Sequence, residues 1–435
     1  MKDPSALLKM MFETARWQNL IEIADEKELD KKLIKQLCYP EERAKLYQLI
    51  IEDKYTVFPP TVAKIPKDTP GEFREVYVNS DLDRIVLTLI NDCLCEMFHD
   101  MIHKNCVSYQ KGIGTQEIVQ RISKEIVKLD KIISTNQIGY KSDFSKYFDT
   151  VSIEAIDNVF NTVEDKLGFE RNTEPVMNLL RRYYHQDYYF DSKNNLHEKY
   201  QSLKQGAAPA AFLANVILYE LDDFMSKKYK IYYRYSDDVC VIDKNTDDVI
   251  KDMNLIIEKY GVKLNPKKVE PLYSDRWFKF LGFNIRGSLI TLSKNRVKKF
   301  QKEIEKRSIK QKKKNKKYTG KQAKRAILRY LYEGEYSWSS SCLGTINVES
   351  DLQELNKYIL DAIRACDTGK LKIGGLGSTN DLKDKTILRG RGRNVKSNRE
   401  KTEEVMDNYL SVKCLSNDLK MSKAIFDVAV KEMKT

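Results

Sequence analysis

The chain has 435 residues, of which 41% are hydrophobic and 32% are charged. This composition is that of a soluble globular protein: it excludes disorder throughout, and the length allows two or three domains with a full core. The formal net charge of +13 favours a polyanionic partner such as nucleic acid. Charge alone leaves a solvated lysine-rich surface equally open.

The eight cysteines and four histidines follow neither a disulfide framework nor a zinc-site spacing. We therefore expect reduced thiols in a cytoplasmic protein. No signal peptide follows Met1, and no apolar stretch is long enough to span a bilayer, so no membrane partner is expected.

The chain opens with apolar residues at helical spacing, and residues 1–54 are predicted to form a helical extension. Residues 62–78 predict two strands joined by a Pro/Gly loop, with Lys67 and Arg74 projecting from the hairpin. Asp81 is then predicted to cap a long apolar helix.

A carboxylate stands at the end of the next predicted strand. That strand ends near Asp143, and Ser152 is predicted to begin a helix. A carboxylate where a strand gives way to a turn is placed like an active-site residue in an α/β protein. The alternative, that Asp143 only hydrogen-bonds the turn that follows, stays open at this point.

Gln205-Gly206 predicts a turn that runs into an almost wholly apolar helix. A helix that is apolar on all sides is buried. The polar side chains of Gln205 and Asn215 at its mouth therefore need hydrogen-bond partners.

Ser236-Asp237-Asp238 lies between two β-prone runs, Ile231–Tyr235 and Val239–Ile242. This pattern predicts a β-hairpin with two adjacent carboxylates at its tip. The carboxylates repel each other unless a cation binds there, and Mg²⁺ prefers oxygen ligands. Asp-Asp also occurs at 222–223 and 247–248, but only the pair at 237–238 has strands on both sides.

Asp143, Asp237 and Asp238 can converge on two divalent ions. Two ions about 3.5–4 Å apart activate an attacking oxygen and stabilise the leaving oxygen in phosphoryl transfer. Lys67 and Arg74 could then clamp a triphosphate.

Two clusters of positive charge follow residue 290. Residues 306–325 hold eleven Lys or Arg, among them Lys312, Lys313, Lys314, Lys316 and Lys317. A solvated helix or loop is the plain interpretation, and contact with a phosphate backbone is the one we favour. Arg389, Arg391 and Arg393 alternate with glycine and suit RNA phosphates.

These motifs, in this order, resemble those of reverse transcriptases, in particular the bacterial branch of group II intron, retron and phage-defence enzymes. The resemblance covers residues 55–290. In the fingers region the resemblance is carried by Ile65-Pro66-Lys67 with Arg74 and by Asp83-Arg84-Ile85-Val86. The first to fourth palm motifs are matched, in order, by Asp143 to Asp149, Gln205-Gly206 to Asn215, Tyr235-Ser236-Asp237-Asp238, and Leu264-Asn265 to Lys268. The primer-grip motif is matched by Phe280-Leu281-Gly282-Phe283.

The resemblance implies an α+β, right-hand polymerase fold with fingers, a palm of antiparallel sheet plus helices, and a mostly helical thumb. It divides the chain into an N-terminal helical extension (1–54), fingers and palm (55–290), and a basic helical thumb or C-terminal RNA-binding region (291–435).

The resemblance also implies an RNA-directed DNA polymerase that uses two Mg²⁺ (or Mn²⁺) ions to add dNTPs to a growing cDNA. Asp143 and Asp237 would be metal ligands, with Asp238 the less direct third carboxylate. Phe148 would exclude a 2′-hydroxyl. The remaining substrate-binding residues would be Gln205 and Gly206 at the nucleotide, Lys67 and Arg74 at its phosphates, and Lys268 of the fourth motif.

The second motif departs from the family pattern. Ala210-Ala211 stand where Ser-Pro is usual, and Pro209 comes one place early, which bears on template or nucleotide handling but leaves the carboxylates intact. No H-N-H endonuclease or clear maturase extension follows. These absences favour a stand-alone enzyme similar to the "unknown group" reverse transcriptases, acting in antiviral defence on a partner noncoding RNA.

Three alternatives remain. A maturase-like RNA-binding protein is opposed by the retention of all three carboxylates and of the primer-grip motif. An RNA-dependent RNA polymerase is disfavoured by Tyr235-Ser236-Asp237-Asp238 in place of Gly-Asp-Asp, and by the bulk of Phe148. A template-independent DNA polymerase is the third. The sequence specifies neither the template nor the priming group, and it leaves a homo-oligomer or a partner protein open.

Overall fold

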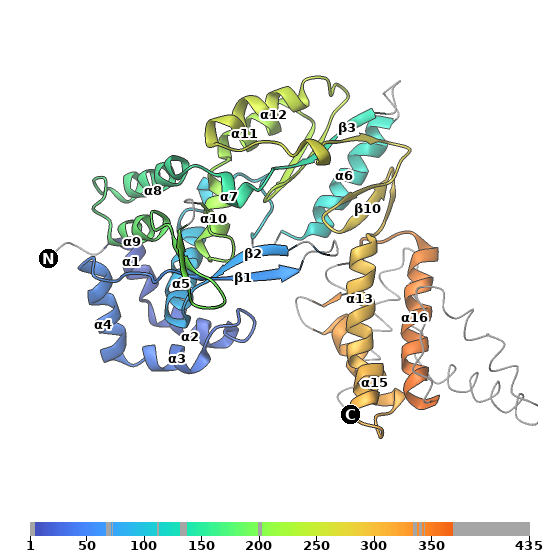
Figure 1. Cartoon of the computed structure of the whole chain (residues 1–435). Helices are drawn as coiled ribbons and strands as arrows, with labels where there is room; N and C mark the ends of the chain where they lie inside the picture. The colour runs from blue at the N-terminus through green and yellow to red at the C-terminus, as the bar shows by residue number, and fades with distance from the viewer. Residues whose placement is uncertain are drawn as a thin grey trace, which may run out of the picture. The chain divides into compact units, whose positions relative to one another are not determined.

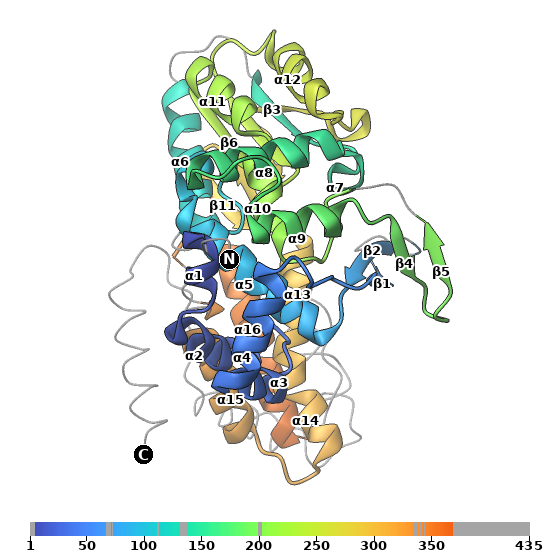
Figure 2. The ribbon, with the colours of Figure 1, turned by 90° about the vertical axis from the view of Figure 1, so that its left-hand side faces the viewer.

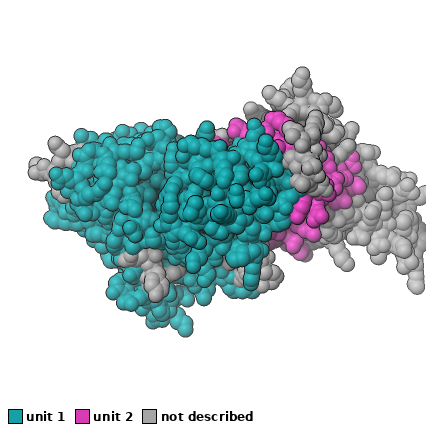
Figure 3. Space-filling view, turned by 90° about the horizontal axis from the view of Figure 1, so that it is seen from above, with its two compact units in different colours: residues 1–111, 137–272 teal, residues 112–136, 273–435 magenta. Residues whose placement is uncertain are grey.

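The computed structural model divides the chain into two compact units (Figure 3). Unit 1 comprises residues 1–111 and 137–272, and unit 2 comprises residues 112–136 and 273–435. The structure describes residues 5–66, 71, 73–110, 113–130, 137–198, 202–333, 337–338, 342 and 344–368. The predicted boundaries after residues 54 and 290 stay predictions.

Unit 1 begins with four short helices, which confirms the helical character predicted for this segment. They are α1 (Ala6–Met11), α2 (Thr14–Ile23), α3 (Lys31–Leu37) and α4 (Pro40–Ile51). Ser5 and Asp30 cap α1 and α3 by accepting hydrogen bonds from backbone amides of the first turn. The apolar faces bury Leu7, Leu8 and Trp17, and α1 and α3 pack against α5 (Asp81–Met97).

The prediction that Asp81 caps α5 is wrong by one residue. Ser80 is the N-cap, because its hydroxyl accepts a hydrogen bond from the amide of Asp83, and Asp81 is the first helical residue. The carboxylate of Asp83 is buried and accepts from the hydroxyls of Tyr55 and Ser80. Asp81 instead lies in the first turn, where a negative charge suits the helix dipole.

A four-stranded sheet projects from the helices of unit 1 (Figure 2). Its order is β2 (Phe73–Val78), β1 (Thr61–Pro66), β4 (Tyr188–Phe190) and β5 (Leu196–Glu198). β1 and β2 are antiparallel, with Ile65 opposite Arg74, which confirms the predicted hairpin. β4 joins β1 in parallel, with Thr61 opposite Phe190.

The second sheet of unit 1 has four strands and is called the central sheet below (its strand β3 is labelled in Figure 1). Its order is β6 (Ile231–Tyr235), β7 (Asp238–Ile242), β3 (Gln137–Asp143) and β8 (Glu270–Tyr273). The predicted β6–β7 hairpin is confirmed, although its turn is one residue shorter than predicted, because Asp238 already belongs to β7.

Helices of unit 1 pack around the central sheet, and α11 (Tyr219–Lys228) lies directly against β6. The other helices that share this hydrophobic core are α7 (Tyr147–Thr150), α8 (Ile153–Leu167), α9 (Pro175–Tyr184), α10 (Pro209–Val216) and α12 (Val249–Ile257). Ser152 caps α8 as predicted. Ile231 to Arg234 of β6 are all buried, as expected for a strand covered on both faces.

Unit 2 combines a three-stranded sheet with helices. The sheet runs β11 (Leu289–Leu292), β10 (Phe283–Arg286), β9 (Phe278–Phe280). α6 (Thr115–Asp130) packs on β10 and β11. The other helices are α13 (Lys294–Arg307), α14 (Ile309–Lys314), α15 (Gly320–Tyr332) and α16 (Glu349–Thr368). No helix in the described part of either unit is both long and apolar enough to cross a membrane.

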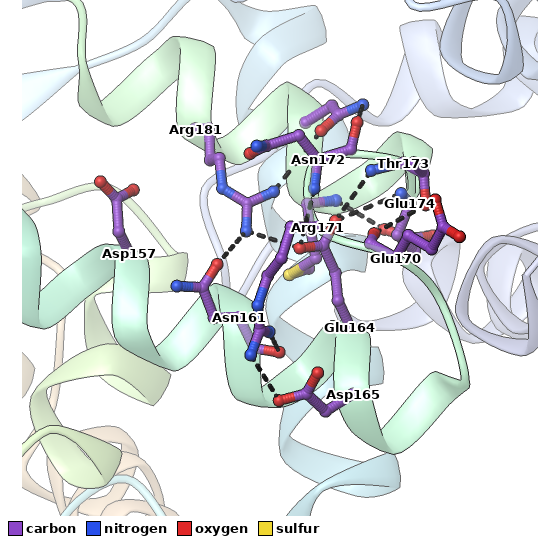
Figure 4. A network of polar contacts seen from close by, with 12 residues as sticks. Asp157, Asn161, Glu164, Asp165, Glu170, Arg171, Asn172, Thr173, Glu174 and Arg181 are labelled. Carbon is purple, nitrogen blue, oxygen red and sulfur yellow. Dashed lines mark hydrogen bonds and ion pairs between the residues drawn. The ribbon is translucent and has the colours of Figure 1, made fainter.

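Two buried glutamates lie close together between α8 and α9 in unit 1 (Figure 4). Glu164 accepts from Arg181 at 2.6 Å and from the amides of Thr173 and Glu174. Burial opposes its charge, but these donors outweigh burial and lower the pKa of Glu164. Glu174 accepts from the Ser5 hydroxyl and has no cationic partner among the described residues, so burial raises its pKa from 4.5 to about 7.

This contrast predicts a pH dependence of stability. The folded state holds the Glu174 proton more tightly than the unfolded chain, so its contribution to stability is full below pH 4.5 and is lost as the pH rises to about 7. A tenfold change in proton affinity is worth about 1.4 kcal/mol. We expect Glu174→Gln to flatten this loss and to make unit 1 more stable than the wild type at pH 8.

The measurement is urea unfolding at pH 5 and pH 8, followed by the fluorescence of Trp17 with Trp277 and Trp338 replaced by phenylalanine. Glu164→Gln is the matched control. It should destabilise the protein at both pH values, because it removes the charge that Arg181 faces. A Glu174→Gln variant that loses as much stability as the wild type between the two pH values would contradict the assignment.

Candidate active site

Three carboxylates meet at one end of the central sheet. Asp143 is the last residue of β3 and Asp238 is the first of β7, and the two lie directly opposite each other in the antiparallel register. Asp237 stands in the β6–β7 turn, where its carbonyl accepts the amide of Phe144 at 3.1 Å. The structure thus places the three aspartates that the sequence singled out at the same end of one sheet, across nearly 100 residues of chain.

Burial and mutual repulsion disfavour negative charge at this end of the sheet. Burial raises the pKa of Asp237, and the charge of Asp143 raises it further. Burial and the charges of Asp237 and Asp143 raise the pKa of Asp238 to about 6. A group of half-buried carboxylates with raised pKa values is typical of a functional site that binds a cation.

The donor chemistry fits a divalent ion. Oδ1 of Asp143 is buried and has no hydrogen-bond partner among the described residues, which leaves a free anionic oxygen. Its Oδ2 forms an ion pair with the ammonium of Lys268. Within the described ranges no three His, Cys, Asp or Glu side chains are grouped closely enough to hold a metal ion as they stand. The ammonium of Lys268 compensates the charge of Asp143 in this arrangement.

Lys268 reaches this position because the fourth motif folds beside β3. It ends a 3₁₀ turn, Pro266–Lys268, which Asn265 caps through its side chain. The amide of Asn265 donates to the carbonyl of Asp143 at 2.9 Å, and Leu264 bridges to Phe144. The predicted substrate-binding Lys268 therefore contacts a carboxylate directly.

The predicted nucleotide-pocket residues are fixed by backbone contacts. Phe148 lies in α7, and its carbonyl accepts the amide of Leu203 just before the Gln205-Gly206 turn. The carbonyl of Gln205 accepts the amide of Tyr77 on β2 at 2.6 Å. Gly206 has φ +106°, and a Cβ there would lie 2.8 Å from the Tyr77 carbonyl oxygen, so this close approach requires glycine.

Arg74, on the same strand as Tyr77, is exposed, and its positive charge offsets a small part of the rise that burial causes in the pKa of Asp237. Lys67, its predicted partner at the phosphates, lies outside the described residues. The early Pro209 of the second motif is the first residue of α10, a position where proline suits a helix because no backbone N–H is needed there.

The predicted basic surface lies in unit 2, on α14 and the turn after it. Lys313, Lys314, Lys316 and Lys317 are exposed. Lys312 is not, because its ammonium folds back and donates to the carbonyls of Lys316 and Tyr318 at 2.8 Å. Arg389, Arg391 and Arg393 lie outside the described residues.

Sequence reasoning missed two buried polar residues behind the carboxylates. Arg234 and Ser108 are both fully buried, and each bonds a backbone group of Ser236. Arg234 could have been noticed, because an arginine in the β-prone run Ile231–Tyr235 must find a buried anion. Nothing in the sequence around Ser108 indicates its contact 128 residues away.

The sequence matches the model of one known protein family. A family model described as "Reverse transcriptase (RNA-dependent DNA polymerase)" matches residues 65–285. No curated protein sequence matches the chain.

The chain is also similar to solved telomerase structures. One is telomerase from Candida albicans in complex with a TWJ fragment of telomeric RNA (12% identity, TM-score 0.46, 92% of this chain and 66% of that one). Others are apo telomerase from Candida tropicalis (14%, 0.44, 87% and 66%) and the same enzyme truncated from its C-terminal domain (16%, 0.39, 56% and 58%). The chain spans between 58% and 66% of the length of these telomerase chains.

Proposed function

The chain belongs to the reverse transcriptase (RNA-dependent DNA polymerase) family, whose model matches 65–285 of its 435 residues, and we propose that it extends a DNA strand with dNTPs on an RNA template. The family match also confirms the expected α+β, right-hand polymerase fold. Unit 1, with its two sheets, would supply fingers and palm, and the helices of unit 2 would supply the thumb.

One observation carries the proposal: Asp143 faces Asp238 across the β3–β7 pair, and Asp237 stands in the adjoining turn. All three lie inside the segment that the family model matches. Raised pKa values of Asp237 and Asp238 suit a site whose charge is balanced by bound cations. So does Oδ1 of Asp143, which has no hydrogen-bond partner in the described part of the chain.

Each residue then has a role. Asp143 and Asp237, with Asp238, would hold two Mg²⁺ (or Mn²⁺) ions, which when bound activate the attacking hydroxyl and stabilise the leaving phosphate oxygen. Arg74 would bind the phosphates of the incoming dNTP beside Asp237. Gln205 and Gly206 would border the nucleotide, and Phe148 would exclude a 2′-hydroxyl. The ion pair between Lys268 and Asp143 would break when the ions bind.

The test is primer extension by the full-length chain on an RNA template, on the same sequence as DNA, and without template. We expect dNTP incorporation that needs Mg²⁺ or Mn²⁺ and follows the RNA sequence. Incorporation without template would favour the template-independent alternative. Tight RNA binding with no incorporation under any condition would favour the maturase-like alternative.

Phe148 provides a test of sugar selection. Phe148→Ala should open space beside the sugar and raise the use of rNTPs relative to dNTPs by about 10- to 200-fold, the range that a few carbon atoms in a pocket usually contribute. The ratio of kcat/KM values for rATP and dATP measures this effect. Phe148→Leu, which keeps most of the bulk, is the control. An unchanged ratio in an active Phe148→Ala enzyme would mean that Phe148 only packs against the core.

The finer assignment is to the bacterial branch of group II intron, retron and defence enzymes, acting in the cytoplasm. Within this branch we propose an enzyme of antiviral defence. Its template would be a structured noncoding RNA. Sequencing the nucleic acid that copurifies with the protein would identify that RNA, and recovery of bulk RNA in proportion to abundance would count against a dedicated partner.

The exposed lysines of unit 2 are proposed to hold this RNA. We expect the quadruple replacement of Lys313, Lys314, Lys316 and Lys317 with glutamine to weaken RNA binding and to flatten its salt dependence. Each phosphate contact contributes about 0.7–0.9 log units of affinity per log unit of salt. Affinity for the copurified RNA, measured from 50 to 400 mM salt, gives the slope. Extension of a short primer–template should survive.

The matched control neutralises four exposed lysines of the N-terminal helices, Lys9, Lys32, Lys35 and Lys45. Both quadruple variants lose the same net charge. Equal losses of affinity and equal slopes in the two variants would refute a specific RNA-holding surface and leave only long-range attraction.

A further inference from the structure

The turn that carries Asp237 has an unfavourable backbone. Ser236 has φ +58°, in the left-handed region, whereas Asp237 does not. A two-residue hairpin with positive φ only at its first central position is a type II′ turn, which normally has glycine there. A side chain at this position crowds the backbone, so the conformation persists only where its surroundings hold it.

Ser236 is held through both of its backbone groups. Its amide donates to the hydroxyl of Ser108 at 3.0 Å, and its carbonyl accepts from Nη1 of Arg234 at 3.3 Å. Ser108, Arg234 and Ser236 are all buried, so water does not compete for these bonds.

Arg234 is itself fixed on every side. Nε and Nη2 form a bidentate pair with Asp222 at 2.7 and 2.6 Å, and both side chains are fully buried. The remaining donors bind the carbonyls of Ala214 and Asn215 at the end of α10, at 2.9 and 2.8 Å. All five guanidinium N–H groups are thereby used.

Ser108 is fixed in the same way. Its hydroxyl donates to Oδ1 of Asn215 at 2.6 Å, and its carbonyl accepts from the side-chain amide of Asn215 at 2.7 Å. The segment before it pairs with β6: the amide of Arg234 donates to the carbonyl of Asn105, and the amide of Val107 donates to the carbonyl of Arg234. Ser108 therefore has little freedom to follow Ser236 if the turn relaxes.

We infer that Ser108 and Arg234 are positioning residues, which clamp Ser236 in its left-handed form. They thereby keep Asp238 opposite Asp143 and hold Asp237 in the adjoining turn. The predicted effect of the clamp on kcat rests on the proposed function. Its predicted effect on the conformation of the turn does not. The carbonyl of Ala214, which accepts a hydrogen bond from Arg234, also accepts one from the hydroxyl of Tyr147 in α7. Arg234 is therefore linked through Ala214 to the residue that precedes Phe148.

Ser108→Ala tests the clamp, because it removes one bond to Ser236 and leaves the Asp222–Arg234 pair in place. We expect kcat to fall about 10- to 100-fold, the loss typical of a displacement of about 1 Å. The KM for dNTP should stay within about twofold, since Arg74 and Gly206 are unchanged. Without divalent ions, backbone amides of residues 231–242 should exchange faster with deuterium, because the turn opens more often.

The double variant Ser108→Ala/Ser236→Gly separates positioning from general damage. Glycine adopts φ +58° without a Cβ, so the turn should hold with one clamp bond fewer. We expect this variant to recover most of the lost kcat and to restore slow exchange. The control, Arg181→Gln, breaks another buried ion pair of unit 1 and should lower thermal stability while leaving kcat and exchange at 231–242 unchanged.

Three outcomes would overturn the inference: wild-type kcat and exchange in Ser108→Ala, failure of glycine at 236 to restore either, or an equal fall of kcat in Arg181→Gln. If the wild type incorporates no dNTP, the proposed function fails. The exchange measurements on Ser108→Ala and the double variant still decide whether the clamp exists.

Discussion

Replacing Asp237 and Asp238 together with alanine is expected to reduce dNTP incorporation by at least about 1,000-fold. The divalent ions that would stabilise charge in the transition state would lose two of their three proposed carboxylate ligands. The fold should not weaken. Burial and mutual repulsion already raise the pKa values of both carboxyl groups, so their removal relieves an unfavourable interaction in the folded protein. Primer extension measures the first effect, and thermal unfolding near pH 8 measures the second.

Asp247→Ala/Asp248→Ala is the matched control, since this adjacent acidic pair is exposed and lies in the same unit. It should retain wild-type incorporation. Full incorporation by the Asp237/Asp238 double variant would remove the active-site assignment. Loss of activity accompanied by a large fall in melting temperature would mean that the two residues act through folding.

The Asp222→Ala variant is expected to lose about 3–5 kcal/mol of stability, the usual cost of breaking a buried ion pair. Burial alone would lower the pKa of Arg234, but the neighbouring Asp222 carboxylate outweighs burial and keeps the pKa above its ordinary value. Without Asp222 the guanidinium keeps its charge and retains only carbonyl partners. Urea unfolding of unit 1, followed by Trp17 fluorescence, gives the free energy of unfolding.

The double variant Asp222→Ala/Arg234→Met completes this measurement. A methionine leaves no buried charge to compensate, so the double variant should be more stable than Asp222→Ala alone. A loss below about 1 kcal/mol for Asp222→Ala would show that water or another group replaces the carboxylate. A double variant that loses the sum of both single effects would show that the pair is not coupled.

Local sequence pattern was sufficient for the elements that carry the site. The β-prone runs on both sides of Asp237 predicted β6 and β7, because alternation and turn residues are local signals. The end of β3 at Asp143 followed from the same kind of signal. The cap of α5 was misplaced by one residue because Ser80 and Asp81 are both good capping residues, and only the hydrogen bond to Asp83 distinguishes them.

Contacts between distant residues could not be predicted in the same way. The ion pair of Lys268 with Asp143 joins side chains 125 residues apart, and Ser108 meets Ser236 across 128 residues. Both depend on how the segments before β8 and before α6 return to the central sheet. Nor does any composition shift indicate that residues 112–136 belong to unit 2.

The placement of α6 in unit 2 has a consequence for how the gene can be divided. Its buried face, with Ile118, Val119, Ile122 and Ile126, covers β10 and β11, which are encoded more than 150 residues later. A gene fragment that begins at codon 273 would therefore encode the sheet without its helix and expose apolar surface. The segment from residue 273 to residue 435 cannot be exchanged as a complete unit between relatives by a single crossover. Only recombination that carries codons 112–136 along, or a circular permutation that joins them to codon 273, would transfer a complete unit.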